Sequence, residues 1–284
     1  MQRILICLFI VAGLWSCKTN VDTEAVNASA QNATDIQAYI KGKSRTTQKT
    51  ASGLYYQITK ANPTGSASAV GNTVTFHYVL FTISGANSAI IDSSSRSKNT
   101  PSTTIFGINR NIQGLEEALS ILKSGEKATL LMPNELAFGS QSTAALPAYS
   151  AIGIDIEILK TRTEEQQIDD YVAAKNLKVE KLASGLRIIK TATTTEAQVA
   201  TGQTYKVNYT GKRVNDVIFD AGTINVGVGS GNVIKGFDEG ISKLRLGEKA
   251  TIIFPSSLGY GTSGSGSTIP PYAVLVFDIE VVKP

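Results

Sequence analysis

The residues that could carry out covalent or metal chemistry are few in this chain of 284 residues. The sequence contains one histidine, His77, and two cysteines, Cys7 and Cys17, all in its first half. Without histidine or cysteine, the second half has no serine triad, thiol nucleophile or zinc site. His77 lies in a predicted strand, where we expect an ordinary surface or edge residue rather than a ligand. The glycines of "GVGSGNVIKG" match no phosphate-binding loop, and the acidic residues show no metal-ligand spacing, so we expect no cofactor and no metal.

An enzyme without these groups must work without covalent chemistry, and rotation about a peptide bond is one reaction of that kind. The barrier to prolyl rotation is about 20 kcal/mol because amide resonance is lost in the twisted state. A dry aromatic pocket for the proline ring and a few hydrogen-bond donors for the carbonyl oxygen lower that barrier. No proton has to move.

Long segments of the sequence recur, which predicts two tandem domains. "SGLYYQI" from Ser52 returns as "SGLRIIK" from Ser184, and "SGEKATLLMP" from Ser124 returns as "LGEKATIIFP" from Leu246. The separation shrinks from 132 to 122 residues along the chain. A repeat this long with a slowly drifting separation indicates duplication of a whole domain with small loop deletions.

The elements that must position a pocket are mostly strands. "LRIIK", "TYKVNYTG", "ATIIFP" and "VLVFDIEVV" are rich in β-branched and aromatic residues and are bounded by Gly, Ser and Pro. One helix is predicted within residues 233–245, where apolar residues recur at helical spacing. An amphipathic helix packed on a sheet predicts the α+β class.

A short helix is predicted ahead of each domain. Thr163 and Gln166 have capping-box spacing at the start of "TEEQQIDDYVAAKN", and Thr34 and Gln37 repeat that spacing. The predicted boundaries are a signal peptide at 1–16, a tether and short helix at 17–47, a first domain at 48–160, a connecting helix at 161–183, and a second domain at 184–284.

The N-terminus has the features of an exported lipoprotein. Arg3 precedes the apolar run "ILICLFIVAGLW", which is shorter than the roughly 20 residues of a membrane-spanning helix. "LWSC" resembles the bacterial lipobox, in which the signal is removed ahead of the cysteine, and Cys17 would then carry the lipid. An ordinary signal peptide with an incidental cysteine is the alternative. The polar stretch after Cys17 predicts a flexible tether, and Lys18 favours a lipid-anchored place in the bacterial envelope, at the outer membrane facing the periplasm.

The charge balance argues against a nucleic-acid partner. The formal net charge is +4, and Lys and Arg form no long runs. Nucleic-acid binding normally leaves a basic patch or stripe, so we expect none.

The second half of the chain resembles the FKBP-type peptidyl-prolyl isomerases over about a hundred residues, from Ser184 to Pro284. The motifs that carry the resemblance are "VNYTGKRVNDVIFDAG", "VIKGFDEGISKLRLGEKATIIFP", "LGYG" and "IPPYAVLVFDIE". The family fold is a twisted antiparallel β-sheet wrapped around a short helix, and the resemblance implies this architecture for both units.

The resemblance also implies a pocket. Its catalytic positions are Tyr209, Phe219, Asp220, Ile234, Tyr260 and Phe277. Its further substrate-binding positions are Ile224, Val233, Phe237 and Ile269. In the family's arrangement the Ile234 backbone N–H and the Tyr260 hydroxyl hold the substrate backbone, while Phe219 and Phe277 enclose the proline ring. Phe237 replaces a tryptophan common in the family, and Ile224 replaces a common aromatic, so we expect a reshaped but still apolar pocket.

The first unit keeps fewer of these residues and is predicted to be a degenerate domain. Tyr78 and Asp92 are retained, but Ile91, Phe138 and Ile154 stand where the second unit has Phe219, Tyr260 and Phe277. The unit either holds polypeptides or serves as a spacer.

Two functional hypotheses follow. In the first, the protein is a peptidyl-prolyl cis-trans isomerase that acts through its C-terminal domain on proline-containing exported polypeptides, anchored to a lipid membrane through acylated Cys17. In the alternative, it is a non-catalytic envelope scaffold or peptide-binding chaperone lipoprotein.

Overall fold

The computed structural model describes residues 23–94, 96–109 and 111–283. The predicted signal peptide, the lipobox and Cys17 lie outside the described residues. Within the described ranges, no helix combines the length and apolar character needed to cross a membrane.

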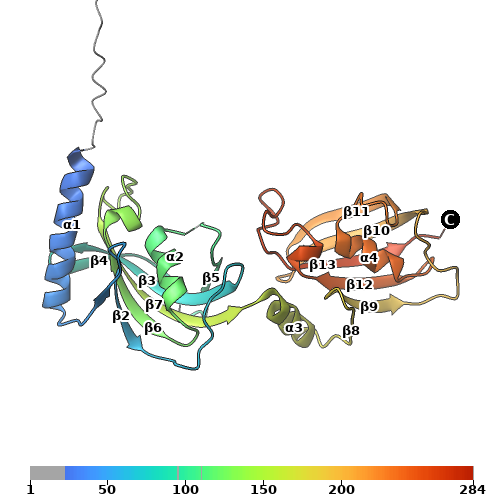
Figure 1. Ribbon diagram of the computed structural model, residues 1–284, viewed down its shortest axis with the longest axis horizontal. Coiled ribbons are helices and arrows are strands. Elements are labelled where there is room, and N and C mark those ends of the chain that lie inside the picture. The colour runs from blue at the N-terminus through green and yellow to red at the C-terminus, as the bar shows by residue number, and fades with distance from the viewer. Residues whose placement is uncertain (1–22, 95, 110, 284) are drawn as a thin grey trace, which may run out of the picture.

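Two domains follow one another along the chain (Figure 1). The first is an antiparallel sheet with strand order β1-β2-β6-β7-β3-β4, and β5 pairs with β3. Its elements are β1 (Gln48–Lys49), β2 (Tyr55–Lys60), β3 (Thr73–Ser84), β4 (Asn87–Ser93), β5 (Ser102–Ile105), α2 (Gln113–Ile121), β6 (Lys127–Met132), the 3-10 turn η1 (Asn134–Leu136) and β7 (Ala151–Arg162).

The second domain has the corresponding sheet, with strand order β11-β10-β13-β12-β9-β8. Its elements are α3 (Glu164–Ala174), β8 (Glu180–Lys181), β9 (Arg187–Ala192), β10 (Thr204–Arg213), β11 (Ile218–Gly227), α4 (Lys235–Ser242), β12 (Lys249–Phe254), the 3-10 turn η2 (Ser256–Leu258) and β13 (Leu275–Val281). The tandem arrangement and the α+β class are confirmed.

Each sheet is covered on both faces, because apolar side chains along its strands point alternately to one face and to the other. In β12 and β13, Ile252, Phe254 and Phe277 belong to the main core with α4, whereas Ile253 and Val276 between them pack with α3. Successive side chains of a strand point to opposite faces, so these are two separate cores. The first domain repeats this division, with α2 on one face and a further helix, α1, on the other.

Helix α1 (Thr23–Gly42) begins well before the predicted position. The tether expected after Cys17 is wrong from Thr23 onward. Thr34 does not cap the helix, because it lies inside it and its hydroxyl donates to the Ala30 carbonyl 3.2 Å away. Ile36 and Tyr39, which are 1% and 5% exposed, pack against the first sheet. The helix is stabilised by this buried face and not by a local start signal.

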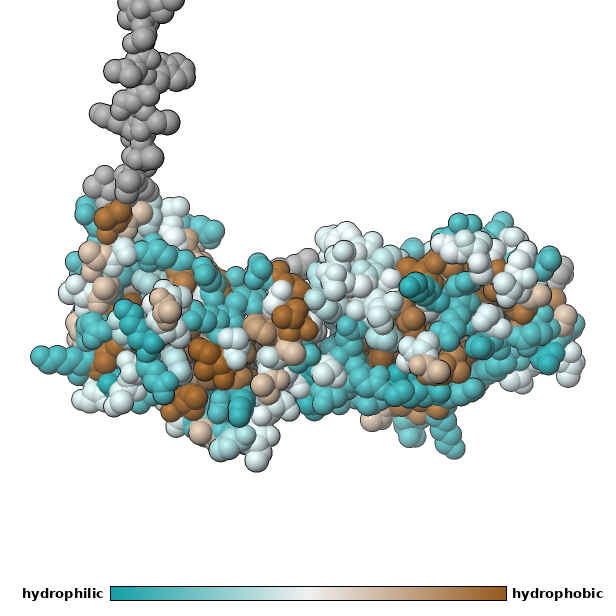
Figure 2. All heavy atoms as spheres, viewed as in Figure 1, coloured by the Kyte–Doolittle hydropathy of each residue, from teal (hydrophilic) through white to brown (hydrophobic). Residues whose placement is uncertain are grey.

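The surface carries few large exposed apolar side chains. Figure 2 shows a face on which hydrophilic residues predominate, with separate hydrophobic patches over both domains. His77 is not at the surface or at an edge as expected. It lies in β3, is 6% exposed, and its Nδ1 is 2.9 Å from the Ser94 hydroxyl.

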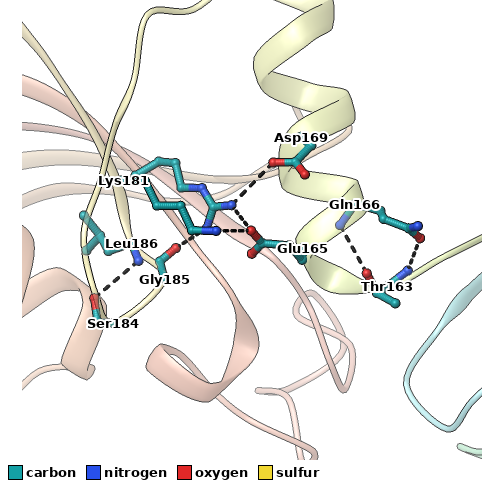
Figure 3. A network of polar contacts seen from close by, with 9 residues as sticks. Thr163, Glu165, Gln166, Asp169, Lys181, Ser184, Gly185 and Leu186 are labelled. Atoms are coloured by element: carbon teal, nitrogen blue, oxygen red, sulfur yellow. Dashed lines mark hydrogen bonds and ion pairs between the residues drawn. The ribbon is translucent and has the colours of Figure 1, made fainter.

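Helix α3 has the predicted capping box, in which the side chains of Thr163 and Gln166 each bond the other's backbone N–H. Figure 3 shows this box beside Glu165, which faces Lys181. Glu165 also pairs with the guanidinium of Arg187, a residue of β9 that is 2% exposed. The Arg187 hydrogen bond, reinforced by Lys181, lowers the pKa of Glu165 to about 2.

Both helices hold the 3-10 turn of the domain that follows them. Asn32 of α1 accepts hydrogen bonds from the backbone N–H and side-chain amide of Asn134, at 2.8 and 3.0 Å. Glu164 of α3 accepts them from the backbone N–H and hydroxyl of Ser256, at 2.5 and 2.8 Å. The repeating unit is therefore a helix followed by a sheet domain, and α3 packs on the second domain as an integral part of it.

Candidate active site

A cleft of about 470 Å³ opens between α4 and the strands β10, β11 and β13 of the second domain. We call it the second-domain cleft. It is lined by Tyr209, Phe219, Asp220, Ile224, Gly231, Asn232, Val233, Ile234, Phe237, Tyr260 and Phe277. Every predicted site residue except Ile269 is among them, so residues from distant parts of the sequence share one cavity.

Phe277 is the centre of the aromatic wall. Its ring meets Phe219 edge-on at a centroid distance of 5.5 Å and Phe237 at 5.1 Å. Tyr209 meets Phe237 edge-on at 5.8 Å. Edge-to-face contacts of this kind are favourable for aromatic rings and fix the walls. Phe277 and Phe237 are 4% and 3% exposed, so the floor of the cleft is dry.

Gly211 makes room for the two phenylalanines, and sequence reasoning missed it. It lies in β10 opposite Phe277 of β13. A Cβ atom at Gly211 would lie 2.6 Å from the Phe219 ring and 2.7 Å from the Phe277 ring, which is closer than real contacts allow. The signal was present, because "YTG" in the second unit stands where the first has "YVL".

Phe219 occupies an irregular place in the sheet. The β10–β11 register passes from Gly211 opposite Asp220 to Lys212 opposite Ile218, which leaves Phe219 unpaired. A bulge of this kind re-aims the extra side chain, and here it directs Phe219 into the cleft. Ile218, just before the bulge on the same strand, is 60% exposed.

Tyr209 and Asp220 form the polar corner of the cleft. The Tyr209 hydroxyl donates to an Asp220 carboxylate oxygen at 2.7 Å. This hydrogen bond, with burial and the carboxylate's charge, raises the pKa of Tyr209, so the phenol stays protonated at neutral pH. Tyr209 is therefore occupied with Asp220, whereas Tyr260, which is 36% exposed, presents its ring from the loop after η2.

The backbone at Ile234 supplies a hydrogen-bond donor. Ile234 is the N-cap of α4 with φ −61° and ψ 146°, and its carbonyl accepts from the N–H groups of Phe237 and Asp238. The first N–H groups of a helix have no partner within the helix, and no described residue accepts a hydrogen bond from the Ile234 N–H. This N–H lies on the cleft wall, where a substrate carbonyl can reach it.

Ile269 does not line the cleft as predicted. It is 5% exposed and belongs to the main core, and its backbone closes a small hairpin with Ser265 through hydrogen bonds of 2.8 and 3.1 Å. Its contribution is to fix the base of the loop that carries Tyr260.

The first domain keeps a cleft at the corresponding place, of about 420 Å³. We call it the first-domain cleft. It is lined by Phe76, Tyr78, Leu80, Asp92, Ser102, Thr103, Thr104, Asn111, Ile112, Leu115, Phe138 and Ile154. The Tyr78 hydroxyl donates to Asp92 at 2.5 Å, and this bond, with burial, raises the pKa of Tyr78. Leu80 occupies the position of Gly211, and Ile91 is not on the wall.

Among the described residues, no group of histidine, cysteine, aspartate or glutamate side chains has the geometry to hold a metal ion. The groups that line the second-domain cleft include its aromatic rings, the Tyr209 and Tyr260 hydroxyls and the Asp220 carboxylate.

The family model for FKBP-type peptidyl-prolyl cis-trans isomerases matches residues 65–159 and 195–282, one segment in each domain. The chain belongs to this family, with two of its domains in tandem.

Curated relatives and solved structures of the same family are similar to parts of the chain. Human peptidyl-prolyl cis-trans isomerase FKBP9 is 27% identical over 222 residues, which are 75% of this chain and 35% of that protein. The chain thus spans about a third of that relative. The FK506-binding protein of Neisseria meningitidis serogroup B is 39% identical over 87 residues, covering 29% of this chain and 80% of that protein. The crystal structure of a peptidyl-prolyl isomerase from Pseudomonas syringae pv. tomato is 26% identical, covers 42% of this chain and 92% of that one, and has a TM-score of 0.38.

Proposed function

We propose that the second domain catalyses cis–trans isomerisation of peptide bonds that precede proline, in exported polypeptides at the bacterial cell envelope. The observation that carries the catalytic part is the second-domain cleft, where an aromatic wall and an unpaired backbone N–H face the same cavity. Membership of the isomerase family supports the same reaction.

The cleft lowers the barrier by favouring the twisted state of the bond. Phe219 and Phe277 hold the proline ring, and the dry floor removes the water that stabilises the polar planar amide. The Ile234 N–H and the Tyr260 hydroxyl donate hydrogen bonds to the neighbouring carbonyl oxygens of the substrate. Because these donors are fixed before the substrate arrives, they cost little reorganisation during rotation.

The catalytic proposal is tested by exchanging one wall between the domains. Phe277→Ile copies Ile154 and keeps an apolar side chain of similar character, so it avoids the unfolding expected of Phe277→Ala, which typically costs about 3–5 kcal/mol. We expect Phe277→Ile to lower the rate constant for isomerisation of an X-Pro peptide at least about tenfold, because half of the ring contact is lost. The assay is the protease-coupled or NMR exchange rate of a short X-Pro peptide.

The matched control is Ile154→Val in the first domain, which we expect to leave the rate unchanged. Equal losses from both substitutions would show that the catalytic role is not confined to the second domain. Binding of the peptide without any acceleration would favour the alternative, a non-catalytic scaffold or peptide-binding chaperone.

The envelope part of the proposal depends on the N-terminal sequence. Its support is the apolar run followed by "LWSC", with a lipid on Cys17 as the membrane contact and proline-containing exported chains as the substrates. Cys17→Ser should move the protein from the membrane fraction to the periplasmic soluble fraction of the expressing bacterium. An unchanged membrane fraction would contradict lipid anchoring while leaving the isomerase assay unaffected.

A further inference from the structure

The first-domain cleft lacks counterparts of the Phe219 and Phe277 rings but has kept a similar volume. Its volume is about 420 Å³, against about 470 Å³ in the second domain. Leu80 and Ile154 replace Gly211 and Phe277 on the wall. Because Leu80 and Ile154 are aliphatic, this wall lacks the ring faces that would enclose a pyrrolidine ring, and it suits an aliphatic side chain instead.

The backbone donor is also kept. Ile112 is the N-cap of α2 with φ −61° and ψ 146°, the same values as Ile234. Its carbonyl accepts from Leu115 and Glu116, and no described residue accepts a hydrogen bond from its N–H. The first-domain cleft can therefore bind a peptide carbonyl as the second does.

The residue directly before this donor is polar in the first domain and apolar in the second. Asn111 lines the cleft where the second domain has Val233. Its Nδ2 donates to Glu116 Oε1 at 2.8 Å and to Thr104 Oγ1 at 3.0 Å. Glu116 is only 9% exposed and also accepts from the Gly107 N–H at 3.2 Å. The buried carboxylate fixes the orientation of the amide, because an amide oxygen cannot face it.

This orientation leaves an acceptor for a ligand. Both hydrogens of Asn111 Nδ2 are used, whereas Oδ1 has only a long contact of 3.3 Å with the Thr104 hydroxyl among the described residues. An amide oxygen has two acceptor lone pairs, so Oδ1 retains capacity for an incoming N–H. Asn111 and Ile112 thus present an acceptor and a donor from adjacent residues.

We propose that the first-domain cleft is a second peptide-binding site, which takes an extended polypeptide at an aliphatic residue other than proline. A secondary amide supplies the N–H that Asn111 Oδ1 accepts and the carbonyl that the Ile112 N–H binds. The imide nitrogen of proline has no hydrogen, so a proline there cannot donate a hydrogen bond to Asn111 Oδ1. The protein then contacts one client at two places with different residue preferences.

The experiment uses the full chain and three fluorescein-labelled pentapeptides that differ only at the central residue, which is leucine, N-methyl-leucine or proline. Anisotropy gives each affinity. We expect the N-methyl peptide to bind up to about tenfold more weakly than the leucine peptide, because it cannot donate a hydrogen bond to Asn111 Oδ1. A photo-leucine version of the leucine peptide should cross-link to residues of the first domain. This comparison needs no variant of the protein.

Two variants locate the effect. Asn111→Val copies the second domain and should remove the difference between the leucine and N-methyl-leucine peptides. Phe277→Ile, the matched control, should leave that difference intact while it slows isomerisation, so the two proposals can fail separately. Equal affinities for the leucine and N-methyl-leucine peptides in the unaltered chain, no binding, or cross-links confined to the second domain would each overturn the proposal.

Discussion

Each domain has a cleft at the corresponding position of its own sheet, and three pairs of corresponding residues distinguish the two clefts. The pairs are Leu80 and Gly211, Ile91 and Phe219, and Ile154 and Phe277. In the second domain the glycine admits two aromatic rings that meet edge-on. In the first domain Leu80 fills that space and the other two positions are isoleucines. The comparison teaches that the aromatic slot depends on a residue without a side chain as much as on the rings themselves.

A glycine also makes room for an aromatic ring in the first domain, on the face of the sheet that packs against α1. Gly153 of β7 leaves room for the ring of Phe81, which would lie 2.1 Å from a Cβ atom there. Phe81 in turn contacts Tyr39 of α1 at a ring distance of 5.7 Å. The second domain thus has its glycine, Gly211, on the face of the sheet that forms the cleft. The first domain has its glycine, Gly153, on the face that packs against α1.

The largest effect is expected from putting the first domain's residue into the second. Gly211→Leu should lower the isomerisation rate about a hundredfold, because displacing the reacting groups by about 1 Å costs that much. The measurement is the rate constant for an X-Pro peptide, with circular dichroism to establish that the domain remains folded. Leu80→Ala, at the corresponding position, should leave the rate unchanged. Full activity in a folded Gly211→Leu protein would show that the glycine is not needed for a working aromatic wall.

A smaller effect is expected from the loop hydroxyl. Tyr260→Phe copies Phe138 and removes one donor without changing the ring. We expect a loss in kcat/KM of up to about tenfold, because a single hydrogen bond contributes about 0.5–1.5 kcal/mol. Phe138→Tyr should not raise the rate, since the first-domain cleft lacks the rings that correspond to Phe219 and Phe277. A rate unchanged by Tyr260→Phe would mean that the Ile234 N–H is the sole donor.

The smallest effect concerns the acid dependence of the ion pair between Glu165 of α3 and Arg187 of β9. Glu165 has a pKa of about 2 in the folded chain, below the value of about 4.3 for an unfolded glutamate. Its contribution to stability is therefore complete above about pH 4.3 and is lost as the pH falls through about 2. Because the Glu165 side chain is 46% exposed, solvent screening keeps this contribution small.

The matched variant is Arg187→Tyr, which copies Tyr55 at the corresponding place in the first domain. Urea midpoints measured at several pH values should show a smaller acid-dependent loss in the variant than in the unaltered chain. The same loss in both proteins would show that the buried arginine does not hold the pKa of Glu165 down.

Much of the fold and most of the site could be predicted because the signals are side chains in repeated patterns. The aromatic residues of the second-domain cleft carry their own evidence, and the recurring motifs fix the tandem arrangement. Gly211 was missed because its role is to leave room for neighbouring side chains. The sequence alone does not show which side chains occupy that room. Ile269 was placed on the cleft wall because the distance along the chain does not show which way a loop residue points.

The N-terminal part of helix α1 was missed for a different reason. Its N-terminal half is rich in small and polar residues, which is the composition of a linker. It is helical because Ile36 and Tyr39 have an apolar surface to cover, and that surface belongs to strands far along the chain. Arg187 could not be recognised as buried, since an arginine in a strand is ordinarily exposed.

The contact of Glu164 with Ser256 has a bearing on where the ancestral duplicated segment began. Ile36 and Ile168 are separated by 132 residues, as are Leu54 and Leu186 in the strands that follow, so helix and strand were copied together. A fragment that starts at Ser184 would lack α3. Ile253 and Val276 would then be exposed to water, and turn η2, which leads to Tyr260, would lose its hydrogen bonds to Glu164. Anyone excising the later copy for study should cut ahead of Thr163.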